Sequence, residues 1–205
     1  MSFYPNNRQE KRLLKNGFAL IAGIDEVGKG AWAGPIVAAA VILNPKIRIK
    51  GIKDSKLLRA PDRKILFNQI VESAIAWATA AVSQTEIDRL GIKQANILVI
   101  QKALKKMRPQ PDYLLIDAIK IDYQNLPSSA IIDGDYKITS VAAASIIAKV
   151  TRDKMMDELA EKYPAYGFKQ HKGYGTSHHF QMIVEHGICQ LHRKTWQPMR
   201  YFLDS

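Results

Sequence analysis

The stretch FALIAGIDEVGKG, residues 18–30, decides the fold, because an apolar run is followed at once by two adjacent acids and a glycine-rich turn. The run Phe18–Ile24 predicts a buried strand, and Ile36–Leu43, rich in valine, isoleucine and alanine, predicts a second strand after the turn. Adjacent carboxylates at the end of a buried strand are costly unless something positive compensates them. Asp25 and Glu26 are therefore candidates for a cation-binding site.

Outward from this hairpin, strands alternate with helices. Further strands are predicted at Tyr113–Asp117, Ala130–Asp133 and Ala76–Val82, where the alanines leave a helix as the alternative for the last. Helices are predicted at Arg8–Asn16, Pro61–Ser73, Thr85–Leu90, Gln94–Met107, Ser140–Tyr163 (with Thr139 or Ser140 as N-cap) and Ser177–His186. This order indicates an α/β fold, a mixed sheet flanked by helices. We expect a basic segment at 1–16 and one domain at 17–205, whose C-terminal part is helical from about residue 165.

The composition is that of a soluble and strongly basic protein. Of 205 residues, 47% are hydrophobic and 24% charged, which is typical of a globular domain. Lys and Arg total 30 against 19 Asp and Glu. A basic surface can simply be solvated, but here the acids concentrate in the candidate site while the bases spread elsewhere, which favours a nucleic-acid partner. The lone Cys189 excludes an internal disulfide. With no membrane segment or signal peptide recognisable, we expect a cytoplasmic protein.

Two further acids, Asp117 and Asp135, lie at or beside the ends of predicted strands. Carboxylates are hard oxygen ligands that suit Mg²⁺ or Mn²⁺ rather than Zn²⁺. Because neighbouring strand residues point to opposite faces, Asp25 and Glu26 can serve one site only if their strand ends there. Asp133 would share a strand face with Asp135, so spacing leaves that choice open. Four such acids facing a polyanion indicate phosphodiester hydrolysis; solvated loop acids are the alternative.

Other residues are candidates for contacts with nucleic acid. The turn Gly28-Lys29-Gly30 lacks the spacing and the following helix of a dinucleotide-binding loop. It suits close approach to a phosphate or sugar, or a plain hairpin turn. On the long predicted helix, Ser145, Lys149 and Arg152 share one face, which could meet phosphates or be an ordinary solvated face. In the loop after that helix, the ring of Tyr174 could stack on a base or sugar, or be buried as a structural residue.

Together these residues resemble type 2 ribonuclease H, the bacterial family that cuts RNA within DNA–RNA duplexes. The resemblance runs from about Gly17 to Met199. Each motif alone is weak, but their order and separation are specific. In order they are GIDEVGKG at 23–30, AGP at 33–35, DSK at 54–56, LID at 115–117, GD at 134–135, AAASIIAKVTRD at 142–153 and HKGY at 171–174.

The resemblance implies a ribonuclease-H-like fold in which Asp25, Glu26, Asp117 and Asp135 hold the metal ions, and it selects Asp135 over Asp133. It implies cleavage 5′ to a ribonucleotide, even a single one embedded in DNA, leaving a 3′-hydroxyl and a 5′-phosphate. The glycine turn would recognise the ribose 2′-hydroxyl. Tyr174 would stack on the sugar at the RNA–DNA junction. Further substrate-binding candidates within the motifs are Lys56, Ser145, Lys149, Arg152 and Lys172.

Three positions depart from the family pattern: Lys29 stands for the usual Arg, Ala118 for Gly, and Asp133 for Lys. Lysine keeps the charge of arginine but loses its planar fork. One alternative is a type 3 relative, whose extra N-terminal domain has no counterpart here. Another is a basic duplex-binding protein without catalysis. The segment Gln197–Phe202 could bind a sliding clamp, although its pattern is poor and a packed tail is the alternative.

Overall fold

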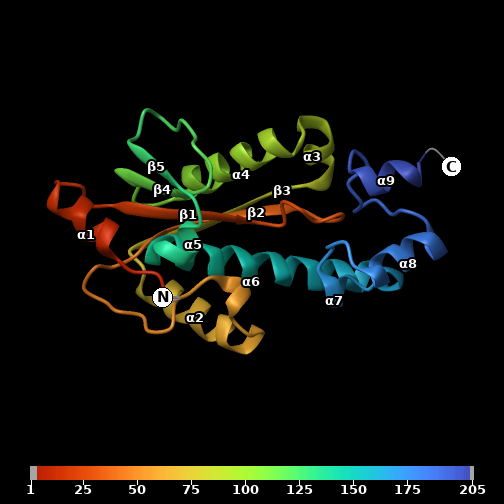
Figure 1. Cartoon of the computed structure of the whole chain (residues 1–205), viewed down its shortest axis with the longest axis horizontal. Coiled ribbons are helices and arrows are strands. Elements are labelled where there is room, and N and C mark those ends of the chain that lie inside the picture. The colour runs from red at the N-terminus through yellow and green to blue at the C-terminus, as the bar shows by residue number, and fades with distance from the viewer. Residues whose placement is uncertain (1–3, 204–205) are drawn as a thin grey trace.

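The computed structural model describes residues 4–203, which form a five-stranded mixed sheet with helices on both faces (Figure 1). The strand order is β3-β2-β1-β4-β5. Strands β1 (Ile21–Val27), β2 (Ile36–Ile42) and β3 (Ala76–Val82) pair antiparallel. Strands β4 (Tyr113–Asp117) and β5 (Ser128–Ile131) continue the sheet parallel to β1. The predicted mixed α/β sheet built on a hairpin is therefore confirmed.

Small residues in the central strands let helices approach the sheet from both sides. Helices α3 (Gln84–Leu90) and α4 (Ile92–Lys106) cover one face, and α2 (Ala60–Ser73) and α6 (Thr139–Lys162) cover the other (Figure 1). Ala39 packs with α6, whereas Ala38 and Ala40 join the core on the α4 side. At Gly23 a Cβ atom would lie 2.1 Å from the carbonyl carbon of Ser140. The start of α6 thus rests directly on β1.

The N-terminal helix α1 (Arg8–Lys15) completes the start of α6. Leu13 is buried, and Oε1 of Glu10 accepts a hydrogen bond of 2.9 Å from the Ser140 amide. The predicted capping by Thr139 or Ser140 is wrong, because Ile138 holds the N-cap position and no side chain of the helix caps it. An acid from a distant helix supplies the acceptor, which also suits the positive end of the helix dipole.

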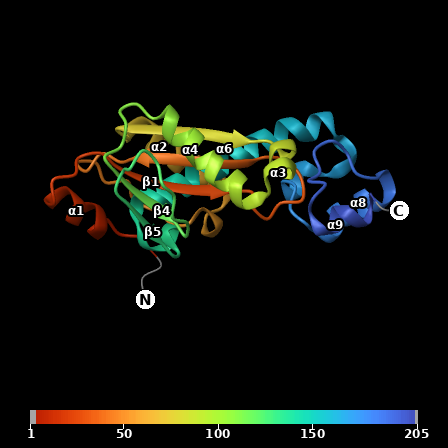
Figure 2. The same ribbon diagram turned by 90° about the horizontal axis from the view of Figure 1, so that it is seen from above.

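The C-terminal part lies beyond one end of the sheet (Figures 1 and 2). It contains α7 (Phe168–His171), α8 (Ser177–His186) and α9 (Gln197–Tyr201), with a 3₁₀ turn at Pro164–Tyr166. Two regions predicted as loop or tail thus contain short helices. None of the helices among the described residues is long and apolar enough to cross a membrane.

The structure corrects two predicted strand boundaries beside the acids. Strand β1 continues to Val27, so Asp25 and Glu26 lie within it rather than after its end. Strand β5 ends at Ile131, and Asp133 adopts a left-handed conformation with φ of 56°. Asp135 belongs to the short helix α5 (Gly134–Lys137). The expectation that Asp133 and Asp135 share a strand face is therefore wrong.

Candidate active site

Asp25 and Glu26 lie on opposite faces of β1. Asp25 shares the face of Gly23, against α6, whereas Glu26 shares the face of Ile24, which packs in the core on the α4 side. The ladder between β1 and β4 ends at the pair Ile24 and Ile116, so both acids extend beyond the last β4 partner. There the charge of Asp117 acts on both of them. Although the strand continues past them, both acids are thus close enough to Asp117 for its charge to raise their pKa values.

Asp117 and Asp135 are joined through the backbone of α5. Asp117 is the last residue of β4, and its Oδ1 accepts a hydrogen bond of 2.7 Å from the Gly134 amide. This contact fixes the start of α5, which carries the buried Asp135. The side chain of Asp133 is 66% exposed and lies 4.0 Å from the Lys137 ammonium. The structure thus brings Asp135 beside Asp117 and leaves Asp133 at the surface.

Burial and mutual repulsion disfavour the ionised state of these four acids. Burial raises the pKa of Asp25 well above its ordinary value, and the charges of Glu26 and Asp117 raise it further. Burial also raises the pKa of Glu26, Asp117 and Asp135. Lys29, whose ammonium lies 3.9 Å from Glu26, partly opposes the effect there. A cation bound among these carboxylates would relieve the repulsion.

A fifth acid, Asp54, belongs to the same cluster and was not assigned to the site from sequence. It is fully buried, its Oδ1 accepts from the Lys56 amide at 3.0 Å, and its other oxygen has no hydrogen-bond partner among residues 4–203. Its charge raises the pKa of Asp135 and of Asp117. The Lys56 ammonium lies 3.4 Å from Asp135 and 3.9 Å from Asp54. The motif Asp54-Ser55-Lys56 was the available signal, but only Lys56 was taken from it.

The donor set fits a hard divalent cation. Every candidate ligand is a carboxylate, the oxygen donor that Mg²⁺ and Mn²⁺ prefer. The repulsion among Asp25, Glu26, Asp117 and Asp135 has no full protein counter-charge, because Lys56 is 74% exposed at the side chain and Lys29 is 57% exposed. Among the described residues, no three His, Cys, Asp or Glu side chains converge around one point. The carboxylates would therefore have to move closer together when an ion binds.

The predicted binding face of α6 is mostly buried. The Ser145 hydroxyl lies 2.9 Å from the Ser55 hydroxyl, and it partly offsets the raised pKa of Asp25. Lys149 pairs with Asp153 at 2.7 Å. Arg152 has no exposed surface and donates to the carbonyls of Pro35, Lys172 and Ala33. Arg152 is therefore not part of a solvated face, and it is not available for a direct phosphate contact. Its guanidinium is satisfied by the backbone.

The predicted recognition residues gather beside this buried arginine. Gly28 has φ of 89°, and a Cβ atom there would lie 2.1 Å from Nε of Arg152. Lys29 and Gly30 are exposed. Tyr174 is half-buried, with its ring centroid 5.2 Å from the Arg152 guanidinium and 5.8 Å from the Lys149 ammonium. The remaining candidate, Lys172, pairs with Asp157.

A chain of neutral histidines holds the backbone of Tyr174. Nδ1 of His179 donates to the Tyr174 carbonyl at 2.9 Å, so its Nε2 must accept from Nε2 of His192, 3.1 Å away. His192 in turn accepts at Nδ1 from the Cys189 amide at 2.8 Å. Both rings are fully buried, and burial lowers the pKa of each to about 4.

This histidine pair predicts a loss of stability in mild acid. Between pH 6.5, the ordinary histidine pKa, and about pH 4, these two histidines bind protons in the unfolded chain but not in the folded chain. The contribution of the two neutral histidines to the free energy of unfolding is complete above pH 6.5. It is lost as the pH falls toward 4, by about 1.4 kcal/mol per pH unit for each fully titrating histidine. Urea unfolding at several pH values should show a flatter profile for His192→Gln, whereas exposed His186→Gln should follow the unmodified chain. If the unmodified chain and both variants had the same dependence of stability on pH, the assignment of a buried neutral histidine pair would be wrong.

Ala118, at the position where the family resemblance leads us to expect glycine, is strained. Its φ is 50°, a left-handed conformation that a Cβ atom disfavours. We expect Ala118→Gly to raise the free energy of unfolding by about 0.5–1 kcal/mol, the relief of strain being partly offset by the entropy of glycine. Thermal unfolding of the two chains without metal measures the difference. A lower melting temperature for Ala118→Gly would show that the alanine is unstrained.

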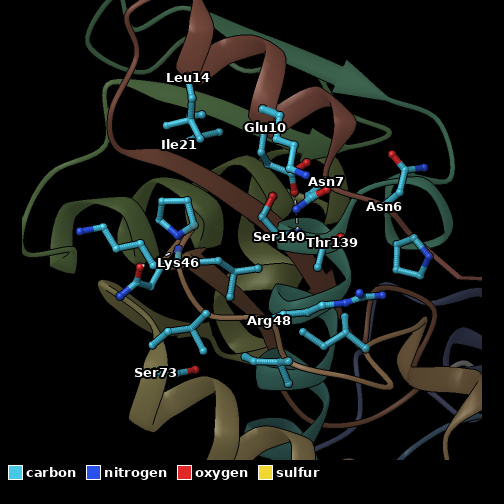
Figure 3. A pocket seen from close by; sticks show the side chains of 18 of the residues that line it. Asn6, Asn7, Glu10, Leu14, Ile21, Lys46, Arg48, Ser73, Thr139 and Ser140 are labelled. Carbon is cyan, nitrogen blue, oxygen red and sulfur yellow. Dashed lines mark hydrogen bonds between the residues drawn. The ribbon is translucent and has the colours of Figure 1, made fainter.

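A cavity of about 800 Å³ lies away from the acids, between α1, the loop at 43–52 and the start of α6 (Figure 3). Glu10, Lys46, Arg48 and Ser140 are among its lining residues, and none of the four acids is. The acid cluster is therefore not the floor of this cavity. It lies where β1 continues past the last residue pair of the β1–β4 ladder.

A mixed sheet of this order, with carboxylates on the central strand β1 and on its neighbour β4, defines the class of ribonuclease-H-like α/β proteins. The profile of the family Ribonuclease HII matches residues 22–199. A ribonuclease HII of Desulfitobacterium hafniense is 46% identical over 197 residues, covering 96% of this chain and 76% of that protein. The chain belongs to the ribonuclease HII family, and it is a ribonuclease H.

Solved structures agree with this assignment. Ribonuclease H2 from Pyrococcus horikoshii superposes with a TM-score of 0.77 at 26% identity, covering 91% of this chain and 98% of that one. The PCNA–RNase HII complex from Archaeoglobus fulgidus matches with a TM-score of 0.69 at 28% identity, covering 87% and 96%. The family resemblance inferred from the motifs is confirmed.

Proposed function

We propose that this ribonuclease H cuts the RNA strand of DNA–RNA hybrids and also cuts 5′ to single ribonucleotides embedded in DNA, leaving a 3′-hydroxyl and a 5′-phosphate. The observation that carries the proposal is the position of the Gly28-Lys29-Gly30 turn, which directly follows the strand of Asp25 and Glu26 and is exposed at Lys29 and Gly30. The elements that read the sugar and those that cut are thereby contiguous. We further propose that the protein acts in the cytoplasm, in replication and repair of DNA.

In this proposal Asp25, Glu26 and Asp117 hold Mg²⁺ or Mn²⁺, and Asp135 completes the site or orients the attacking water. The ions, when bound, supply an activated water and stabilise the leaving oxygen. Asp25 is buried, and the hydrogen bond from the Gly134 amide restrains Asp117, so we propose that these two carboxylates change position little while the other ligands close around the ions. The net charge of +11 attracts the duplex, so binding should weaken steeply with salt.

Cleavage of a DNA duplex with one embedded ribonucleotide tests the proposal. The reaction is run with Mg²⁺, Mn²⁺ or EDTA, beside an all-DNA duplex of the same sequence. Metal-dependent cleavage 5′ to the ribonucleotide alone is expected. Preference for a long hybrid over the single ribonucleotide would favour the type 3 alternative. Salt-dependent binding without metal-dependent cleavage of either substrate would favour a duplex-binding protein.

Tyr174→Ala should lower cleavage at a single embedded ribonucleotide by about 10- to 100-fold, since stacking of one ring on one nucleotide contributes about 1–3 kcal/mol. Tyr174→Phe keeps the ring and should retain most activity. The kcat/KM ratio of the three chains on the same duplex measures the effect. Equal activity of the alanine variant would remove Tyr174 from the site.

A sliding clamp is a second proposed partner, favoured by exposed apolar groups around α9. Tyr201 is 80% exposed and Leu203 48%, whereas Met199 is buried. The Archaeoglobus fulgidus relative was solved in complex with PCNA. If this end binds a clamp, Tyr201→Ala should weaken co-elution with a bacterial clamp without changing cleavage of a short duplex. Unchanged co-elution, or none with the unmodified chain, would exclude this role.

A further inference from the structure

The turn Gly28-Lys29-Gly30 is held by a side chain from the far end of the sequence. Arg193, between α8 and α9, is completely buried. Its guanidinium donates to the carbonyls of Gly28 at 2.6 Å and Lys29 at 2.9 Å. It also donates twice to the carbonyl of Gly34, at 3.2 and 3.0 Å. One planar group therefore ties the start of the turn, Gly28 and Lys29, to Gly34 further along the chain.

The backbone of Arg193 strengthens this link. Its amide donates to the Trp32 carbonyl at 2.8 Å, and the Gly34 amide donates to the Leu191 carbonyl at 2.9 Å. The acceptors of the Arg193 guanidinium are all backbone carbonyls. A buried cation bonded in this way organises the backbone and gains little from ion pairing. Burial accordingly lowers the pKa of Arg193 to about 9.

The direction of these bonds sets the direction of two amides. In a trans peptide the N–H points away from the C=O of the same plane. With the Gly28 and Lys29 carbonyls turned inward to Arg193, the amides of Lys29 and Gly30 turn outward. Both residues are exposed, and neither amide donates to another described residue. Two free donors thus face the solvent just beyond the acids of β1.

We propose that Arg193 is a positioning residue for ribonucleotide recognition, which fixes two peptide planes so that the amides of Lys29 and Gly30 meet the ribose. This inference rests on the proposed function, in which the turn reads the 2′-hydroxyl. Arg193 itself does not touch the substrate. Removing it leaves the acids in place but lets the two donors move, and a misplacement of about 1 Å can cost about 100-fold in rate.

The test measures ribonucleotide preference in binding, which a loss of overall stability does not change. The Asp117→Asn background prevents cleavage, and affinity is compared for a duplex with one ribonucleotide and its all-DNA counterpart. Arg193→Met should lower the ratio of the two affinities by about 10-fold, as expected when hydrogen bonds to the sugar are lost. Arg193→Lys keeps the positive charge but not the planar guanidinium, so its affinity ratio should lie between those of Arg193→Met and the unmodified chain. In chains that retain Asp117, kcat/KM on the ribonucleotide duplex should fall in the same order.

A second variant covers the case in which Arg193→Met does not fold. Asp88 accepts from the Lys194 and Thr195 amides, both at 2.9 Å, and anchors the chain just after Arg193. Asp88→Ala should shift the ratio in the same direction by a smaller amount. The matched control is Asp112→Ala, since Asp112 accepts from the Ala19 and Leu20 amides before β1, and it should leave the ratio unchanged.

The outcomes separate the inference from the proposed function. If the unmodified chain neither cuts at nor prefers the ribonucleotide, the proposed function fails. If it does both, and a folded Arg193→Met keeps the ratio within about twofold, only the positioning role fails. If Arg193→Met does not fold, the Asp88→Ala variant decides. An affinity ratio equal to that of Asp112→Ala would then overturn the positioning role of Arg193.

Discussion

Asp117→Asn is expected to lower cleavage by about 10³-fold or more, because the amide has lost the charge that holds a divalent ion. The fold should survive, since the asparagine oxygen can still accept from the Gly134 amide that Asp117 now bonds at 2.7 Å. Without metal the variant should even be more stable. Removing one of several repelling carboxylates is expected to raise the melting temperature by about 2–4 °C for each 1 kcal/mol gained.

Three measurements on purified protein check this prediction. They are cleavage of the ribonucleotide duplex with Mg²⁺, thermal unfolding in EDTA, and the rise in melting temperature when Mg²⁺ is added, which should shrink in the variant. Asp133→Asn is the matched control, since Asp133 is close in sequence to Asp135 but its side chain is 66% exposed. It should keep activity within about twofold. Near-normal cleavage by Asp117→Asn would refute the metal-site assignment.

Gly28→Ala is expected to damage stability and recognition together. The new Cβ would lie 2.1 Å from Nε of Arg152, at a residue whose φ of 89° already disfavours any side chain. Arg152 must then move and lose its bond of 2.9 Å to the Pro35 carbonyl. We expect a loss of about 2–4 kcal/mol in the free energy of unfolding and about 100-fold in cleavage at a single ribonucleotide.

Gly30→Ala is the contrasting variant two residues further along. Nothing lies within 4 Å of a Cβ atom added there, and its φ is not in the left-handed region. Urea unfolding should therefore change by less than about 0.5 kcal/mol. Any fall in cleavage by Gly30→Ala reports on approach of the substrate to the turn. If Gly28→Ala unfolded at the same urea concentration as the unmodified chain, the close contact with Arg152 would be wrong.

The sequence predicts the elements of this fold well where sterically special residues or strong alternation mark their ends. Two strands, Ala76–Val82 and Tyr113–Asp117, and one helix, Ser177–His186, have the predicted bounds. Strand β1 was misplaced because charged residues read as the end of an apolar run, whereas the structure keeps Asp25 and Glu26 inside the strand. Their burial is a functional cost that a hydrophobic pattern does not represent.

The arginines show why part of the site could not be predicted. The helical spacing of Ser145, Lys149 and Arg152 suggested an exposed face, but Arg152 is buried because carbonyls from distant loops satisfy it. Arg193 bonds residues 164 and 165 positions earlier, with no local motif to signal the contact. Asp54 was visible in its motif, but only packing reveals that it is buried beside Asp135.

The link between Arg193 and the turn also bears on how the enzyme is made. The acids proposed to bind metal all precede residue 136, and they are synthesised long before Arg193, which holds the Gly28-Lys29-Gly30 turn. A nascent chain can therefore carry every acid of the cluster before Arg193 is present to hold the Gly28-Lys29-Gly30 turn.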